Sequence, residues 1–151
     1  MYNKPLVITP GEPSGIGVEI TLKAWKSGQT GVFFLLDDPD RVKERAKVID
    51  LDLPLRIIGK PSEAKEYFSD ALPVLPHYFS STCVPGKPSV ENANAVIKAL
   101  DIAVDFVEQG YRPYSRIFLH RRGSGCAPCE AFRFLLHWSA SILLPEYRFF
   151  D

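Results

Sequence analysis

The stretch that decides the fold is "ITPGEPSGIGVEI", residues 8–20, which lies between an apolar run and a helical pattern. Gly11, Gly15 and Gly17 lack a Cβ atom at points where the backbone has to turn or approach a neighbour closely. Two prolines stiffen the approach, so we expect the loop to be ordered before a ligand arrives. The free amides at the start of the following helix are a ready binding site for an anion. The stretch therefore predicts a rigid strand-to-helix corner beside a charged ligand.

Two carboxylates in this corner, Glu12 and Glu19, are placed to cap the amides or to face a ligand. The alternative is a tight turn with no ligand at all, because short glycine patterns recur by chance. The spacing alone leaves both interpretations open. The predicted anion-binding, cleft-lining residues are Gly11, Glu12, Gly15, Gly17 and Glu19.

Outward from the corner, apolar runs alternate with helical patterns. The runs that predict strands are residues 5–9, 31–39, 53–59 and 71–78. The helical patterns cover residues 17–28, 38–51, 61–70 and 89–110. This alternation favours an α/β fold with a mostly parallel sheet and flanking helices.

The last of these helices has the clearest signals. Ser89 is placed to accept from the first-turn amides, and Gly110 is placed to end the helix in a left-handed conformation. Residues 96, 100, 103 and 107 repeat at helical spacing and predict one apolar stripe toward the sheet.

The bulk composition is typical of a globular protein and points to no charged macromolecular partner. The formal net charge is zero, 46% of residues are hydrophobic and 24% are charged. No run of about 18 apolar residues predicts a membrane span, and the N-terminus lacks a signal-peptide pattern, so we expect a cytoplasmic protein. Three cysteines are too few for a disulfide framework.

The character of the sequence changes at Tyr111. Up to Gly110 the chain holds all nine lysines and fifteen of its eighteen acidic residues. The later part contains no Lys, Val, Thr, Asn or Gln residue. The later part carries six arginines and nine of the eighteen aromatic residues, with neither helical nor strand periodicity. We therefore expect residues 111–151 to be an irregular tail, and we interpret it as the product of a shifted reading frame.

Two motifs carry a resemblance to a known family. "VITPGEPSGIGVEITLKAW", residues 7–25, resembles the "TxGEPxGIGPE" opening of the 4-hydroxythreonine-4-phosphate dehydrogenases, with Val18 where the family usually has proline. "PGKPSVENANAVIKALDIAVDFVEQG", residues 85–110, resembles their "GxxSxENGxxxxxxLxxA" helix. The resemblance runs from about Lys4 to Gly110, and residues 111–151 do not match.

The resemblance implies a fold similar to that of the isocitrate and isopropylmalate dehydrogenases, with two α/β domains, a cleft between them, and a homodimer. Residues 1–110 would then be the N-terminal part of such a two-domain enzyme. It implies oxidation and decarboxylation of a phosphorylated hydroxythreonine in pyridoxal phosphate biosynthesis. NAD or NADP takes the hydride, and a divalent metal polarises the forming carbonyl.

The later motifs of the family are missing from this chain. The "GHTE" substrate motif and the separate metal-binding histidines have no counterpart, so the resemblance implies no metal ligand here. His137, in "AFRFLLHW", falls on the spacing of the substrate histidine, although the residues around it differ. We therefore expect a truncated chain that is inactive alone. The alternative is a fragment or pseudogene product with no activity of its own.

The tail supports two further interpretations, which we consider weaker. Cys126 and Cys129 form a C-x-x-C pair, which suits a redox pair or half of a zinc site, and otherwise represents two incidental thiols. Arginines interleaved with aromatic residues suit a nucleic-acid-binding segment. The first 110 residues offer no matching basic face, so we expect no nucleic-acid partner.

Overall fold

The computed structural model describes residues 4–114, and the side chains of residues 4–111. They form five parallel strands and four α-helices in one compact unit. The elements in chain order are β1 (Leu6–Ile8), α1 (Gly17–Lys26), β2 (Phe33–Asp37), α2 (Pro39–Val48), β3 (Leu55–Ile57), α3 (Ala64–Tyr67), β4 (Leu72–Pro76), α4 (Ala93–Glu108) and β5 (Arg112–Tyr114). Short 3-10 turns, Pro61–Glu63 and Val90–Asn92, precede α3 and α4.

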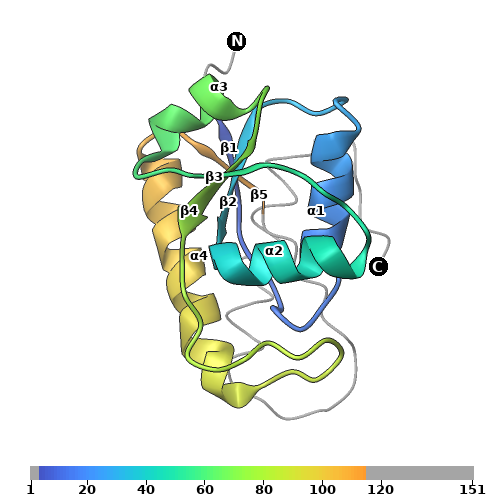
Figure 1. Ribbon diagram of the computed structural model, residues 1–151. Helices are drawn as coiled ribbons and strands as arrows, with labels where there is room; N and C mark the ends of the chain where they lie inside the picture. The colour runs from blue at the N-terminus through green and yellow to red at the C-terminus, as the bar shows by residue number, and fades with distance from the viewer. Residues whose placement is uncertain (1–3, 115–151) are drawn as a thin grey trace, which may run out of the picture. The chain divides into compact units, whose positions relative to one another are not determined.

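The sheet has the strand order β3-β4-β2-β1-β5, and every neighbouring pair is parallel. The crossovers through α1 and α2 move along the sheet in one direction, and those through α3 and α4 move back in the other. Because parallel crossovers are right-handed, the two helix pairs cover opposite faces, as Figure 1 shows. The predicted α/β fold with a mostly parallel sheet and flanking helices is therefore confirmed.

Each face of the sheet has its own hydrophobic core. Strand β2 is buried over its whole length, and its successive side chains point alternately into the two cores. Phe33 and Leu35 pack with Leu22 of α1 and Val42 of α2 in the first core. The second core lies under α3 and α4, and its buried members are Val7, Phe34, Leu36, Ile58, Ala64, Ala99 and Ala103. The continuous apolar run of β2 thus reflects coverage on both faces.

Helix α2 begins as its sequence predicts. The Asp38 carboxylate accepts a hydrogen bond of 2.9 Å from the Asp40 amide, and Pro39 occupies the first helical position. The helix buries two arginines, Arg41 and Arg45, beside its apolar residues. The mixed-charge pattern of residues 41–51 gave no sign of this burial.

Helix α4 ends as predicted but faces the sheet with different residues. Gly110 has φ +86° and ends the helix in the left-handed region. Ser89 accepts from the Glu91 amide at 3.3 Å, but a 3-10 turn intervenes before α4. The most buried positions are Ala95, Ala99, Leu100 and Ala103, whereas residues 96 and 107 are only half-buried. Small alanines bring α4 close to the sheet, so its buried face is rotated from the predicted stripe.

The sheet continues past Gly110. Strand β5 pairs with β1 in parallel register, with Leu6 opposite Arg112. The Tyr111 ring packs edge-on against Phe34, with ring centroids 6.4 Å apart, and Lys4 lies 4.9 Å above it. The predicted loss of structure directly after Gly110 is therefore wrong for residues 111–114. The rest of the predicted irregular tail lies outside the described residues.

No helix among residues 4–114 is long and apolar enough to cross a membrane.

Candidate functional site

The glycine-rich corner lies at the carboxyl edge of the sheet, between β1 and α1. Gly11 has φ +62°, a conformation that favours glycine. Gly15 donates its amide to the Glu12 carbonyl at 3.0 Å, and a Cβ at Gly15 would lie 3.2 Å from that oxygen. The conformation of Gly11 therefore favours glycine, and a side chain at Gly15 would crowd the turn.

The start of α1 carries no side-chain cap. Ile16 precedes the helix, its side chain is 62% exposed, and no side chain accepts from the first-turn amides. A Cβ at Gly17 would lie 3.8 Å from the Pro10 carbonyl, which is an ordinary contact. The lack of a side chain at Gly17 is therefore not required by packing, and the first amides of α1 have no side-chain acceptor. Gly17 is half-buried, and Val18 and Glu19 after it are buried.

The two carboxylates of the corner have different surroundings. Glu12 Oε1 accepts at 2.9 Å from the Ser14 amide, which lies before α1, and so Glu12 does not cap the amides at the start of the helix. Glu19 is buried, and its Oε1 accepts from Arg45 at 2.8 Å. Its second oxygen, Oε2, is buried without a hydrogen-bond partner. Glu19 therefore faces α2 and serves as a counterion.

Two buried ion pairs brace the corner from α2. Arg41 donates from Nε to Asp37 Oδ1 at 2.9 Å and also binds Oδ2, so the pair is bidentate. Asp37, at the end of β2, is fully buried, which raises the pKa of its carboxyl, and the Arg41 guanidinium opposes this rise. Arg41 and Arg45 also donate to the Pro13 carbonyl, at 2.8 and 3.2 Å. Sequence reasoning missed this network.

The second motif reaches the first at the same edge of the sheet. Ser14 donates its hydroxyl to the Lys87 carbonyl at 2.9 Å, across 73 positions of sequence. The Gly86 amide donates to the Ser14 carbonyl at 2.8 Å. The structure therefore joins the glycine corner to the loop that precedes Val90–Asn92.

Asn92 holds the same loop through Ser81 and Cys83. Its side chain is buried, accepts from the Ser81 amide at 2.9 Å, and donates to the Ser81 carbonyl at 3.1 Å. It also donates to Cys83 Sγ at 3.4 Å, and burial raises the pKa of the Cys83 thiol. Residue 92 is the asparagine of the "SVEN" motif, so this motif shapes the loop.

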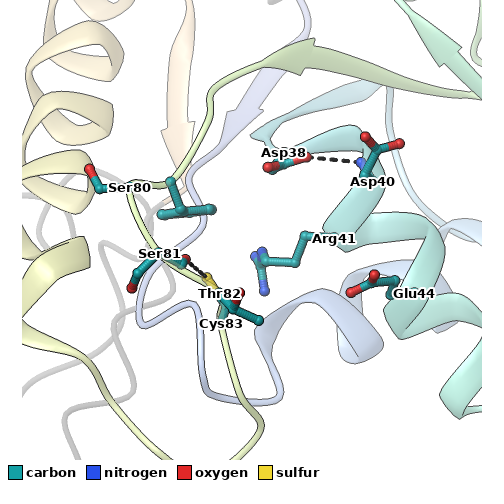
Figure 2. A pocket seen from close by; sticks show the side chains of 9 residues that line it. Asp38, Asp40, Arg41, Glu44, Ser80, Ser81, Thr82 and Cys83 are labelled. Atoms are coloured by element: carbon teal, nitrogen blue, oxygen red, sulfur yellow. Dashed lines mark hydrogen bonds between the residues drawn. The ribbon is translucent and has the colours of Figure 1, made fainter.

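A pocket of about 400 Å³ opens between the start of α2 and this loop (Figure 2). Figure 2 shows Arg41 between Glu44 on the helix and Thr82 and Cys83 on the loop. No residue of the glycine corner lines this pocket, although Arg41 contacts both the pocket and the corner.

A second, narrow cavity lies at the corner itself and is lined by Thr9, Gly17 and Asp37, among others. The Thr9 hydroxyl is buried without a hydrogen-bond partner among the described residues. We place the candidate site at the corner, because the uncapped amides lie there.

Residues 4–114 contain no group of three or more His, Cys, Asp or Glu side chains that is suited to a metal ion. The ring of His77 contacts the Ala95 carbonyl, with Nε2 at 2.7 Å. We therefore assign the metal that the resemblance implies to no residues in the described part of the chain. His137, Cys126 and Cys129 lie outside the described residues.

We predict that Gly11→Ala destabilises the fold by roughly 1–2 kcal/mol, because a Cβ is strained in the left-handed region. The free energy of unfolding from urea titration measures this change. Gly31→Ala is the matched control, since Gly31 has no positive φ and no heavy atom lies within 4 Å of a Cβ placed there. Equal losses in both variants would contradict the strained-turn explanation.

Comparison with curated proteins finds several relatives that carry the same name. A 4-hydroxythreonine-4-phosphate dehydrogenase from Xanthobacter autotrophicus is 38% identical over 109 residues, which make up 70% of this chain and 31% of that protein. The enzyme of the same name from Methylorubrum populi is 40% identical over 113 residues, 72% of this chain and 32% of that protein. The chain thus spans about a third of the length of these relatives.

A third relative with this name, from Bradyrhizobium diazoefficiens, is 33% identical over 136 residues. The match covers 80% of this chain and 39% of that protein, and so it extends past Gly110. This extension agrees with the pairing of β5 in the sheet.

Solved structures agree on the fold. A 4-hydroxythreonine-4-phosphate dehydrogenase from Klebsiella pneumoniae matches with a TM-score of 0.64 at 20% identity, over 75% of this chain and 37% of that one. One from Burkholderia phymatum has a TM-score of 0.63, also at 20% identity, over 73% and 34%. No family model matches the chain. On the strength of the curated relatives, the matched stretch of this chain belongs to the 4-hydroxythreonine-4-phosphate dehydrogenase family.

Proposed function

We propose that this chain supplies one wall of the ligand cleft in an NAD(P)-dependent 4-hydroxythreonine-4-phosphate dehydrogenase of vitamin B6 biosynthesis. One observation carries the proposal most strongly: the two motifs that resemble this family meet through the hydrogen bond from Ser14 to the Lys87 carbonyl. Two motifs that both line one ligand site must lie close together in the fold, even when they are far apart in the sequence.

The electrostatics of the corner suit a phosphorylated substrate or a dinucleotide, since both carry anionic oxygens. The first-turn amides of α1 have no side-chain cap and lie at the positive end of the helix dipole. The two nearby carboxylates are engaged, Glu12 by the Ser14 amide and Glu19 by Arg45. An anionic group at the corner therefore meets the uncapped amides, with the charge of Glu19 neutralised by Arg45 and Glu12 held by the Ser14 amide but still charged.

The proposed roles are limited to binding and orientation. Gly11 and Gly15 shape the turn, Gly17 places no side chain over the uncapped amides, and Glu12 holds the Ser14 amide. We assign no metal-dependent step to residues 4–114, among which no group of three or more metal-ligating side chains is found. The metal and the nicotinamide would supply carbonyl polarisation and hydride acceptance in the complete enzyme. We also propose that residues 1–110 belong to the N-terminal part of a two-domain, dimeric enzyme.

The experiment separates binding from turnover. The purified chain is titrated with NAD⁺, NADP⁺ and 4-phosphooxy-L-threonine by calorimetry, and reduction of the nicotinamide is then followed with Mg²⁺ or Zn²⁺ present. We expect saturable binding of at least one of these ligands, and at least a fivefold weaker affinity in Gly17→Val, whose side chain covers the amides. Turnover would extend the proposal to a complete active site. No binding of any ligand would contradict it and favour a chain with no activity of its own.

A further inference from the structure

The Pro13 carbonyl oxygen accepts hydrogen bonds from two guanidinium groups. Arg41 Nη1 donates to it at 2.8 Å and Arg45 Nη2 at 3.2 Å. The two arginines lie four positions apart and therefore share one face of α2. Their side chains are only 7% and 6% exposed, so water does not compete strongly for these bonds. A single backbone oxygen in the candidate site is thus held by two buried cations.

Each arginine also has its own buried carboxylate. Asp37 of β2 binds Arg41, and Glu19 of α1 binds Arg45. The cluster is neutral and connects β2, α2 and α1 around the corner. An unpaired buried charge is strongly unfavourable, so each carboxylate keeps its arginine side chain in place. In that place the guanidinium group also reaches the Pro13 carbonyl.

The peptide bond that follows Pro13 transmits this constraint. A trans peptide is planar, and its N–H points opposite to its C=O. With the Pro13 oxygen held toward α2, the Ser14 N–H points away from α2, where it donates to Glu12 Oε1 at 2.9 Å. We propose that Arg41 and Arg45 are positioning residues that fix the Pro13–Ser14 peptide and thereby the backbone of the corner that leads into α1.

The consequence for a ligand rests on the proposed function. The Ser14 amide already donates to Glu12, so a ligand would meet the amides in the first turn of α1. A backbone that is fixed ahead of that turn before binding loses little conformational entropy when a ligand arrives. Loosening the peptide should then weaken ligand affinity, although neither arginine needs to touch the ligand. Both act through the backbone, which distinguishes them from residues that bind directly.

The test uses the double variant Arg45→Met with Glu19→Gln, which removes one donor to Pro13 and leaves no unpaired buried charge. Amide hydrogen exchange of the full chain is measured by NMR. We expect the Ser14 and Gly15 amides to exchange at least tenfold faster, with the rate at Ala99 in α4 unchanged. Arg45→Lys should give an intermediate rate, because one ammonium cannot replace both donors of the guanidinium fork. Lys43→Met on the same helix is the matched control and should change none of these rates.

A purely structural role predicts a different pattern. If the ion pair only stabilised the fold, exchange at Ala99 would accelerate along with that at Ser14, and the proposal would be overturned. Unchanged exchange at Ser14 would overturn it as well. Titration with NAD⁺ tests the consequence for binding, with at least fivefold weaker affinity expected in Arg45→Lys. A wild-type chain that binds no NAD⁺ would contradict that consequence, while the exchange rates still decide the positioning role.

Discussion

Replacing Arg41 by methionine is expected to destabilise the fold by about 3–5 kcal/mol, the largest effect that we predict for one substitution. The methionine fills much of the same space but leaves the Asp37 carboxylate buried without its bidentate partner. Asp37 is completely inaccessible to water, so no solvent compensates for the lost cation. Chemical denaturation of the full chain at neutral pH measures the change.

Two further variants isolate the cause. Arg41→Met combined with Asp37→Asn has no unpaired charge and should recover part of the loss. Arg56→Met is the surface control: Arg56 is exposed on β3 and stacks on the Tyr67 ring at 4.4 Å, so its loss should be below about 1 kcal/mol. If the double variant is no more stable than Arg41→Met, the unpaired carboxylate is not the cause.

The deficit of Arg41→Met should depend on pH. Burial raises the pKa of Asp37, and removing the opposing guanidinium raises it further. A folded carboxyl with a raised pKa holds its proton more tightly than the unfolded chain does, so stability falls as pH rises through that window. The difference from wild type should therefore shrink as the pH is lowered toward the ordinary range of aspartate. A constant difference across pH would contradict this.

Local signals were enough to predict most of the fold. The apolar run of β2 needs burial on two faces, Asp38 and Pro39 specify the start of α2, and Gly110 specifies the end of α4. Each of these features is decided by residues adjacent in sequence, where propensity and capping act directly. The left-handed turn at Gly11 belongs to the same class.

The features that the sequence did not reveal depend on distant partners. Arg41 and Arg45, in a run of mixed charge, have the pattern of a solvated helix face, and their burial depends on Asp37 and Glu19 from other elements. Strand β5 is recognisable only through its pairing with β1. The rotated face of α4 likewise follows from close packing of alanines on the sheet, which helical spacing alone does not specify.

Within the candidate site the same distinction holds. The corner was recognisable from the sequence because its glycines and prolines act on the local backbone. The family was recognisable because the motif of this corner resembles that of the 4-hydroxythreonine-4-phosphate dehydrogenases. The direction of the Glu19 side chain depends on tertiary structure, because its partner Arg45 lies 26 positions away in the sequence. That Gly11, Glu12, Gly15, Gly17 and Glu19 bind a ligand remains a prediction.

Changing Asn92 to aspartate is expected to destabilise the fold by about 3 kcal/mol at neutral pH, although the two side chains have nearly the same shape. The amide of Asn92 donates to the Ser81 carbonyl and to Cys83 Sγ, and it accepts from the Ser81 amide. A carboxylate retains only the acceptor role, and it places a buried negative charge against the Ser81 oxygen. Unfolding by urea measures this loss.

Protonation offers an internal check on this explanation. A protonated aspartic acid regains one donor and loses its charge, so Asn92→Asp should approach wild-type stability as the pH falls below the ordinary aspartate range. Asn94→Asp, two residues further along in α4, is the matched control, because Asn94 is exposed and an acidic residue in the first turn of α4 interacts favourably with the helix dipole. Since Asn92 holds the loop that Ser14 contacts, Asn92→Asp should also weaken ligand binding at the corner, whereas Asn94→Asp should not. Equal stability of the two variants at neutral pH would show that the buried amide does not hold this loop.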